Sequence, residues 1–328
     1  MTNSTVSHLR DDREILLRVE NLVVEYTTKA GTVRAVSDVS LDVAAGETVA
    51  IVGESGCGKS TLAKGVMQLI PTVSGKVLLN GNDLASLKGE ELRRARPNIQ
   101  MIFQDSISSL DPHLRVRELV EQPLKVWGRG TDEERRAKVD DLLRSVNLDP
   151  AIVGDRKPTE FSGGQCQRIS IARALSIEPQ LLVCDEPVSS LDVSIQAQIL
   201  NIIQAMKIRY GLSLLFISHD LAVVRAISDC VYVMYLGKVC EVAPPERLAS
   251  SPAHHYTHAL VSAVPIPDPT VGRRRAILEG EPPSPTNPPS GCRFRTRCPA
   301  ATEKCAAEEP QLREVSPGQF VACHHPRG

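Results

Sequence analysis

The chain has 328 residues, of which 42% are hydrophobic, so it can bury one large core or two modest ones. Its 38 basic and 39 acidic residues give a formal net charge of -1, which excludes the basic excess that nucleic-acid binding usually needs. No apolar stretch approaches the roughly 18 to 20 residues that span a bilayer, and the polar start lacks the apolar segment of a signal peptide. We therefore expect a cytosolic protein with no nucleic-acid partner, which reaches a membrane only through other subunits.

After a polar tail over residues 1–14, alternating apolar residues over 17–24 and 39–43 predict strands. The period becomes helical between about 105 and 160, where Thr131 and Glu134 have the spacing of a capping box. From 180 to 233, buried apolar runs alternate with helical ones, including a helix over 194–210 that Gly211 should end. This order predicts the parallel-sheet core of an α/β domain with a helical insertion.

A glycine-rich loop follows the apolar strand ETVAIV and precedes the helix-compatible LAKGVMQLI. Residues 53–61 fit the pattern GxxxxGK[ST] at every defined position, so we reject a chance glycine turn. Backbone N–H groups of such a loop bind phosphate oxygens, while Lys59 neutralises phosphate charge and Ser60 offers a hydroxyl to Mg²⁺. The residues predicted to bind the nucleotide here are Gly53, Ser55, Gly56, Cys57, Gly58, Lys59, Ser60 and Thr61.

Two adjacent carboxylates follow the apolar run over 181–184, at the strand end where ligands collect in open α/β sheets. Asp185 would hold Mg²⁺, and Glu186 would orient and polarise the water that attacks the γ-phosphorus. His219 ends the next apolar strand and would donate a hydrogen bond to the γ-phosphate. A lone histidine at a strand end is more often structural, so its role depends on its order after the acids.

The segment Phe161-Ser162-Gly163-Gly164-Gln165 opens a helix-compatible stretch, and with the loop and the acids it makes about residues 15 to 260 resemble the ATP-binding cassette (ABC) family. The resemblance implies an ABC-type P-loop NTPase fold with an antiparallel β subdomain and a helical subdomain. It implies that Ser162, Gly163, Gly164 and Gln165 contact the ATP of an opposite subunit, so that hydrolysis needs two cassettes.

The same resemblance implies a role or a position on a helix for three further residues of the cassette segment. Gln104 would meet Mg²⁺, and Tyr26 would stack on adenine, although an ordinary strand aromatic is a serious alternative for Tyr26. Cys166 stands where the family commonly has arginine, at a position that we expect on the helix surface.

The C-terminal part of the chain is similar to the dipeptide and oligopeptide importers of this family. GKVCEVAPPERLASSPAHHYTHALVSAVP closes the ATP-binding domain at 15–263, a proline-rich linker follows over 264–290, and a cysteine-rich extension covers 291–328. The segment FQDSISSLDPHLRVRELV resembles the same branch.

The nine cysteines fall into two populations. Five lie in apolar or motif segments, where small buried hydrophobes are expected: Cys57, Cys166, Cys184, Cys230 and Cys240. Four thiols in a reducing compartment favour a metal site over disulfides, and the absence of CxxC pairs favours a 4Fe-4S cluster over Zn²⁺. The resemblance implies such an iron-sulfur cluster on Cys292, Cys298, Cys305 and Cys323.

The resemblance implies an ATP-hydrolysing translocase subunit at the cytoplasmic face of the inner membrane, held there peripherally, that energises uptake of dipeptides or oligopeptides. The implied partners are a second ABC ATPase subunit, identical or related, two transmembrane permease subunits and an extracytoplasmic substrate-binding protein. Nickel and glutathione are alternative cargoes. A soluble ABC ATPase of translation or DNA repair, or a cluster-bearing regulator, are alternative functions, and the presence of Glu186 and His219 argues against a non-hydrolysing switch.

Overall fold

The computed structural model describes residues 8–10, 12–29, 31–264 and 280–327, which divide into two compact units. Unit 1 spans residues 1–86 and 218–328, and unit 2 spans residues 87–217, within those limits. Most of the expected N-terminal tail and much of the expected proline-rich linker, over 265–279, lie outside the described residues. In the described ranges, no helix combines the length and the apolar character needed to cross a membrane.

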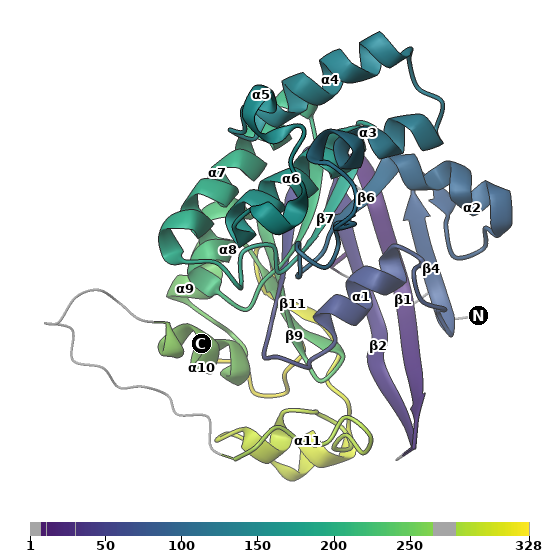
Figure 1. The fold of residues 1–328 in the computed structure, drawn as a ribbon. Helices are drawn as coiled ribbons and strands as arrows, with labels where there is room; N and C mark the ends of the chain where they lie inside the picture. The colour runs from purple at the N-terminus through teal and green to yellow at the C-terminus, as the bar shows by residue number, and fades with distance from the viewer. Residues whose placement is uncertain (1–7, 11, 30, 265–279, 328) are drawn as a thin grey trace, which may run out of the picture. The chain divides into compact units, whose positions relative to one another are not determined.

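Unit 1 contains an antiparallel sheet in the order β2-β1-β4-β5 (Figure 1). Its strands are β1 (Ile15–Thr28), β2 (Gly31–Ala44), β4 (Ser74–Leu79) and β5 (Asn82–Asp83). The alternating apolar residues of β1 turn inward, so that Leu17, Val19 and Leu22 are fully buried. Helix α1 (Lys59–Val66) packs against β1 and β2 on the buried side of this sheet.

Unit 1 also contains a second run of strands in the order β11-β12-β10-β9-β3, in which only the β3–β9 pair is parallel. These strands are β3 (Thr48–Val52), β9 (Cys230–Tyr235), β10 (Lys238–Ala243), β11 (Arg313–Ser316) and β12 (Gln319–Val321). The helices nearby are α8 (Leu221–Ile227), α9 (Pro245–Ser250) and α10 (His255–Ala263). All five residues of β3 are buried, as expected of a parallel strand covered on both faces.

The C-terminal segment of unit 1 packs on the core of that unit. It contains the 3-10 turn η3 (Arg295–Arg297) and helix α11 (Glu303–Ala307) besides β11 and β12. Phe294 is 2% exposed and joins a hydrophobic cluster with residues of β3, β9 and α8. The strand β12 pairs with β10, so the end of the chain is joined to the sheet by backbone hydrogen bonds.

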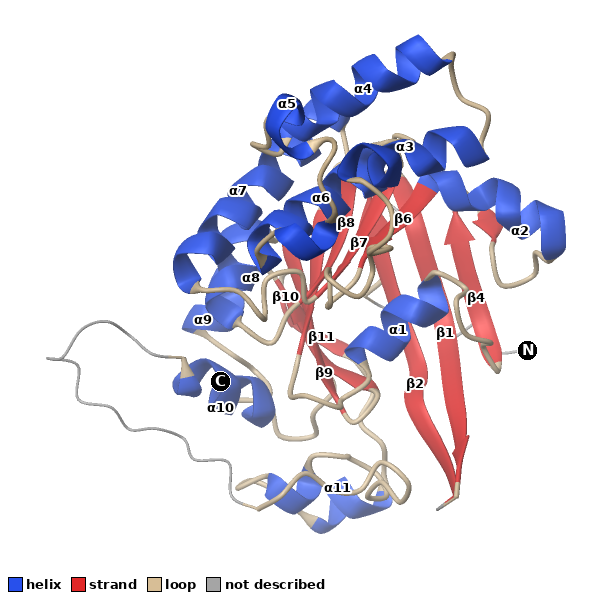
Figure 2. Ribbon diagram, viewed as in Figure 1, coloured by secondary structure: helices blue, strands red, loops and turns tan. Residues whose placement is uncertain are grey.

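Unit 2 contains the parallel strands β8-β7-β6 and most of the helices. Figure 2 draws the strands in red and the helices in blue. Its strands are β6 (Ile99–Ile102), β7 (Leu181–Asp185) and β8 (Ser213–Ile217). Its helices are α2 (Gly89–Ala95), α3 (Val116–Val126), α4 (Asp132–Ser145), α5 (Pro150–Val153), α6 (Gly163–Leu175) and α7 (Val193–Tyr210), with 3-10 turns η1 (Arg96–Asn98) and η2 (Pro158–Glu160).

Two local predictions for unit 2 are confirmed. Thr131 caps α4, accepting a hydrogen bond from the Glu134 N–H at 3.3 Å while the Glu134 carboxylate accepts from the Thr131 N–H at 2.7 Å. Gly211 ends α7 in the left-handed conformation, with φ of 61°. Helices α3, α4 and α6 pack on one another, and α6 also contacts β6, so the helical layer is joined to the sheet through α6.

Candidate functional site

The glycine-rich loop of unit 1 joins β3 to α1, in the predicted order of strand, loop and helix. Gly58 has φ of 106°, and a Cβ atom there would lie 2.1 Å from the carbonyl oxygen of Ala35. A Cβ atom at Gly53 would lie 2.2 Å from the carbonyl oxygen of Met234. Both positions therefore require glycine, because the loop is pressed against the backbone of its neighbours.

Lys59 lies at the first position of α1 and is 4% exposed. Its Nζ donates hydrogen bonds to the carbonyl oxygens of Gly53 at 2.8 Å and Glu54 at 3.0 Å. The ammonium group is thus held inside the curve of the loop, at the positive end of the helix dipole. This combination of a buried cation, loop N–H groups and a helix N-terminus suits an anion such as a phosphate chain.

Tyr26 and Thr61 lie beside each other near the start of α1. The Tyr26 hydroxyl donates to Thr61 Oγ1 at 3.4 Å, and the Tyr26 side chain is 38% exposed. A partly exposed ring next to the loop has a free face that a flat aromatic ligand can cover. Ser60 is half-buried in the same helical turn, and burial raises the pKa of the Cys57 thiol, which keeps it neutral.

In unit 2, the carboxylates follow β7 and the glutamine follows the adjacent strand β6. Gln104 Nε2 donates to Glu186 Oε2 at 3.2 Å, so two residues separated by 82 positions meet at one sheet edge. Asp185 is 3% exposed at the end of β7. Glu186 has φ of 45°, which turns its side chain out of the strand direction, and its N–H donates to the carbonyl of Ile217 at 3.0 Å.

The segment Ser162 to Gln165 forms the N-terminal cap of α6. The Ser162 N–H donates to Gln165 Oε1 at 3.0 Å, and the Gln165 N–H donates to Ser162 Oγ at 3.4 Å. Ser162 is exposed and residues 163–165 are half-buried, so the capped N-terminus of the helix is partly open to solvent. Gly163 and Gly164 lie in that turn, and a Cβ at Gly164 would be 2.6 Å from Ile195 Cγ2.

Cys166 is fully buried, and its thiol donates to the Pro158 carbonyl at 3.5 Å. The expectation that this position lies on the helix surface is therefore wrong, because the cysteine faces the interior of unit 2. Of the five cysteines expected to be small buried hydrophobes, the structure buries Cys57, Cys166, Cys184 and Cys240 and leaves Cys230 partly exposed.

His219 is exposed in unit 1, directly after Ser218, whose N–H donates to the Ile51 carbonyl of β3 at 3.2 Å. Asp220 follows and caps α8 by accepting from the Ala222 N–H at 2.8 Å. The imidazole therefore belongs to a short, well-anchored connection rather than to a helix or strand. The loop, Tyr26 and His219 thus belong to unit 1, and Gln104, Asp185, Glu186 and residues 162–165 belong to unit 2. Within these sets, hydrogen bonds join Tyr26 to Thr61 and Gln104 to Glu186.

The four cysteines of the C-terminal segment lie near one another in unit 1. Burial, together with the proximity of Cys305 and Cys298, raises the pKa of Cys292, and burial raises the pKa of Cys323 to about 11. Nevertheless, across the described ranges no three His, Cys, Asp or Glu side chains are grouped so as to hold a metal ion. The expected four-thiolate site is therefore not formed among the described residues. Cys292 and Cys298 pack against one hydrophobic cluster, and Cys323 belongs to another.

Two contacts to the glycine-rich loop could not be predicted from the sequence. The Tyr256 hydroxyl accepts from the Glu54 N–H at 2.7 Å, and Arg297 pairs with the Glu54 carboxylate at 2.9 Å. The partners are 202 and 243 positions apart, so no local spacing could predict them.

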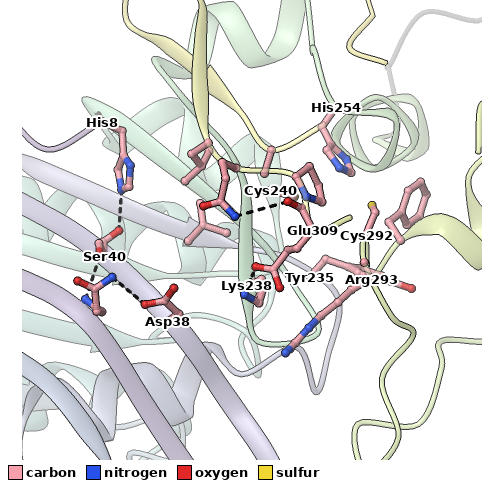
Figure 3. Close-up of a pocket in the computed structure, with 18 residues that line it drawn as sticks. His8, Asp38, Ser40, Tyr235, Lys238, Cys240, His254, Cys292, Arg293 and Glu309 are labelled. Carbon is pink, nitrogen blue, oxygen red and sulfur yellow. Dashed lines mark hydrogen bonds and ion pairs between the residues drawn. The ribbon is translucent and has the colours of Figure 1, made fainter. Parts of the chain in front are cut away.

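A separate cavity of about 350 Å³ lies in unit 1. Figure 3 shows the residues of β2, β10 and the C-terminal segment that line it. Lys238 is paired with Glu309 there, and Asp38 accepts a hydrogen bond from Asn21 at 2.7 Å. Residues 53–61 do not line this cavity. Lys238 and Glu309 compensate each other's charge, and we assign the cavity no ligand.

Comparison with known proteins extends these observations. The family described as ABC transporter matches residues 36–189, and the family described as oligopeptide/dipeptide transporter, C-terminal region, matches residues 240–305. The loop, the carboxylates and the capped α6 are therefore those of a P-loop cassette, and the chain belongs to the ABC transporter family.

Curated relatives match almost the whole chain. The oligopeptide transport ATP-binding protein OppF of Salmonella typhimurium is 49% identical over 325 residues, which cover 95% of this chain and 97% of that protein. OppF of Haemophilus influenzae is 47% identical over 325 residues, covering 95% and 98%. A dimeric post-hydrolysis structure of the ATP-binding cassette MJ0796 bound to ADP and Pi matches with a TM-score of 0.64 at 29% identity, covering 70% of this chain and 98% of that one.

Proposed function

We propose that the chain is the ATP-hydrolysing subunit of an importer of dipeptides or oligopeptides. The observation that supports this most is the similarity to OppF over 95% of the chain, which includes the C-terminal region as well as the cassette. The buried Lys59 of the loop and the Gln104–Glu186 pair at the end of β7 supply the chemistry of such a motor.

In this proposal, the loop N–H groups and Lys59 bind the β- and γ-phosphates of ATP, and Tyr26 stacks on adenine. Ser60, Gln104 and Asp185 hold Mg²⁺, which neutralises charge that develops on the phosphate oxygens. The donor set fits this ion, since Mg²⁺ prefers a carboxylate and neutral oxygens. Glu186 accepts hydrogen bonds from the attacking water and orients it, and His219 donates to the γ-phosphate.

The capped N-terminus of α6 offers its outward dipole to the nucleotide of a second cassette. We infer that Ser162, Gly163, Gly164 and Gln165 serve the ATP of a partner subunit, which is a copy of this chain or a related one. The dimeric state of MJ0796 supports this pairing. The paired cassettes would lie peripherally at the cytoplasmic face of the membrane. Two transmembrane permeases and an extracytoplasmic substrate-binding protein would complete the importer.

We further propose that residues 291–328 are a cysteine-rich extension in which Cys292, Cys298, Cys305 and Cys323 take up a 4Fe-4S cluster. Their common neighbourhood in unit 1 supports this, while their present side-chain positions do not form a ligand set, so binding requires deprotonation and convergence of the sulfurs. Iron and acid-labile sulfide assays on anaerobically purified protein test the proposal. Stoichiometric zinc without iron, or neither metal, would refute it.

Two variants test the motor proposal. We expect Glu186→Gln to bind ATP with near-normal affinity but to hydrolyse it about 100-fold or more slowly, because water loses its general base. Glu178→Gln is the matched control, since Glu178 also has a positive φ, of 54°, but pairs with Lys138 on the surface of unit 2. Unchanged hydrolysis by Glu186→Gln would contradict the role of that carboxylate.

Lys59→Ala should abolish ATP binding itself, because the loop loses its only side-chain cation within residues 53–61. Binding is measured with a fluorescent ATP analogue on the full-length chain. If affinity is retained, the loop is not the nucleotide site and the proposed function is wrong.

A further inference from the structure

The segment from Cys292 to Cys298, whose sequence is CRFRTRC, makes direct contacts with the machinery that holds the glycine-rich loop. Within this segment Arg293, Phe294 and Arg297 contact the core of unit 1. By contrast, the Arg295 side chain donates to Ser290, within the C-terminal part of the chain. The three inward residues contact different groups, and all of these groups lie at or next to the loop.

Arg297 holds the loop directly. Its two terminal nitrogens donate to the two carboxylate oxygens of Glu54 at 2.9 and 3.2 Å, and one of them also donates to the Tyr235 hydroxyl at 3.3 Å. The side chain of Arg297 is only 6% exposed, and that of Glu54 is 25% exposed. A two-point pair with this degree of burial has fixed geometry and is weakly screened by salt.

The backbone of Glu54 is held as well. Its N–H donates to the Tyr256 hydroxyl at 2.7 Å, so both the main chain and the side chain of this loop residue are fixed from outside the loop. The carbonyl oxygen of Glu54 also accepts one of the two hydrogen bonds that the Lys59 ammonium group donates to the loop. A displacement of Glu54 would therefore change the position of the cation that the proposed function assigns to phosphate.

Arg293 holds the loop indirectly, through the turn between β9 and β10. It donates to the carbonyl of Leu236 and to Ser37 Oγ at 2.8 Å. The next residue in that turn, Gly237, donates its N–H to the Cys57 carbonyl at 2.8 Å. The turn thus lies between Arg293 and the loop, so a displacement of Arg293 would displace the turn and with it the loop.

Phe294 fixes the segment between the two arginines. Its ring lies 5.3 Å from that of Tyr235 and 5.5 Å from that of Tyr256, centroid to centroid. These are the same two tyrosines whose hydroxyls bond to Arg297 and to the Glu54 N–H. The aromatic packing therefore sets the direction in which both arginines extend.

We propose that Arg293, Phe294 and Arg297 form a clamp that positions the glycine-rich loop for the nucleotide, with Arg297 as the principal positioning residue through its pair with Glu54. This inference rests on the proposed function, because it assumes that the loop binds ATP. The clamp adjusts affinity and leaves the chemical step unchanged, since its contacts are made to the loop and to the turn that supports the loop. It also links the C-terminal segment to the ATP site without any metal.

The test compares Arg297→Met with Arg295→Met in the full-length chain. We expect Arg297→Met to raise the KM and the Kd for ATP about tenfold, the equivalent of ~1.4 kcal/mol, with kcat changed by less than about twofold. Arg295→Met should behave as the unchanged chain, since it removes the same charge from the same segment without touching the loop. A variant that is merely less folded would lower kcat and leave KM unaltered.

Glu54→Gln and Arg297→Lys keep the test decisive if Arg297→Met folds poorly. Arg297→Lys keeps the charge but not the two-point geometry, so it should raise KM by about threefold. Combining Glu54→Gln with Arg297→Met should raise KM no further than Arg297→Met alone. Additive effects, or a normal KM for Arg297→Met, would overturn the clamp. If Lys59→Ala retains ATP affinity, the proposed function fails; if only Arg297→Met retains it, the clamp alone fails.

Discussion

His254 is buried at the start of α10, and its burial makes the stability of unit 1 depend on pH. The side chain is 2% exposed, and its Nδ1 accepts a hydrogen bond from the Tyr256 N–H at 3.1 Å. Burial, assisted by the nearby His255, lowers the pKa of His254 from 6.5 to about 3. The folded chain therefore keeps this imidazole neutral where the unfolded chain protonates it.

The size of the effect follows from the difference in protons bound. As the pH falls below 6.5, the unfolded state gains a proton that the folded state does not, so the free energy of unfolding decreases. At pH 5.0 the loss relative to pH 8.0 is about 2 kcal/mol. Any folded-state pKa below about 4 gives nearly the same loss at pH 5.0, so the prediction depends little on the lowered value.

His254→Asn isolates this contribution. Asparagine does not titrate, and its side-chain oxygen can still cap α10 by accepting from the Tyr256 N–H. Urea unfolding followed by far-UV circular dichroism at pH 8.0 and 5.0 should show a stability loss about 2 kcal/mol smaller than in the unchanged chain. The exposed His113 offers a control, His113→Asn. Parallel pH dependences for His254→Asn and the unchanged chain would refute the reasoning.

Three further variants probe other parts of the fold. Phe294→Ala should cost about 3 to 5 kcal/mol in urea unfolding, while Val315→Ala, at a 37% exposed position of the same C-terminal segment, should cost less than about 0.5. Arg10→Met should cost about 3 kcal/mol, because it leaves the fully buried Asp42 carboxylate without its main partner, and a cost below about 0.5 would contradict that packing. Glu186→Gly should raise the melting temperature, since it relieves a positive φ at about 1 kcal/mol, and an unchanged or lower value would count against strain there.

Local sequence rules predicted those features whose causes are local. The glycine-rich loop depends on a strand, a loop and a helix that are consecutive in the chain, and the cap of α4 depends on Thr131 and Glu134 three positions apart. The end of α7 also has a local cause, because the helix stops where Gly211 itself adopts a left-handed conformation. Each of these features could be read from fewer than about ten residues.

Features that depend on distant partners could not be predicted. Arg10 lies in a polar stretch with no periodic pattern, yet it donates to Asp42 at 2.8 Å and to Glu47 at 2.5 Å. The pairing of Arg297 with Glu54 could not be predicted either, because charged residues are common and the fold decides which of them meet. Cysteine spacing indicated a metal site, but spacing does not fix where the sulfurs lie.

The pair between Arg297 and Glu54 joins residues that are 243 positions apart, with the partner of the loop close to the end of the chain. A ribosome adding about 5 to 20 residues per second makes Arg297 roughly 12 to 50 seconds after Glu54. During synthesis the glycine-rich loop is therefore complete long before the clamp can close on it. A nascent chain would gain its full affinity for ATP only after the segment that contains Arg297 has been made and packed.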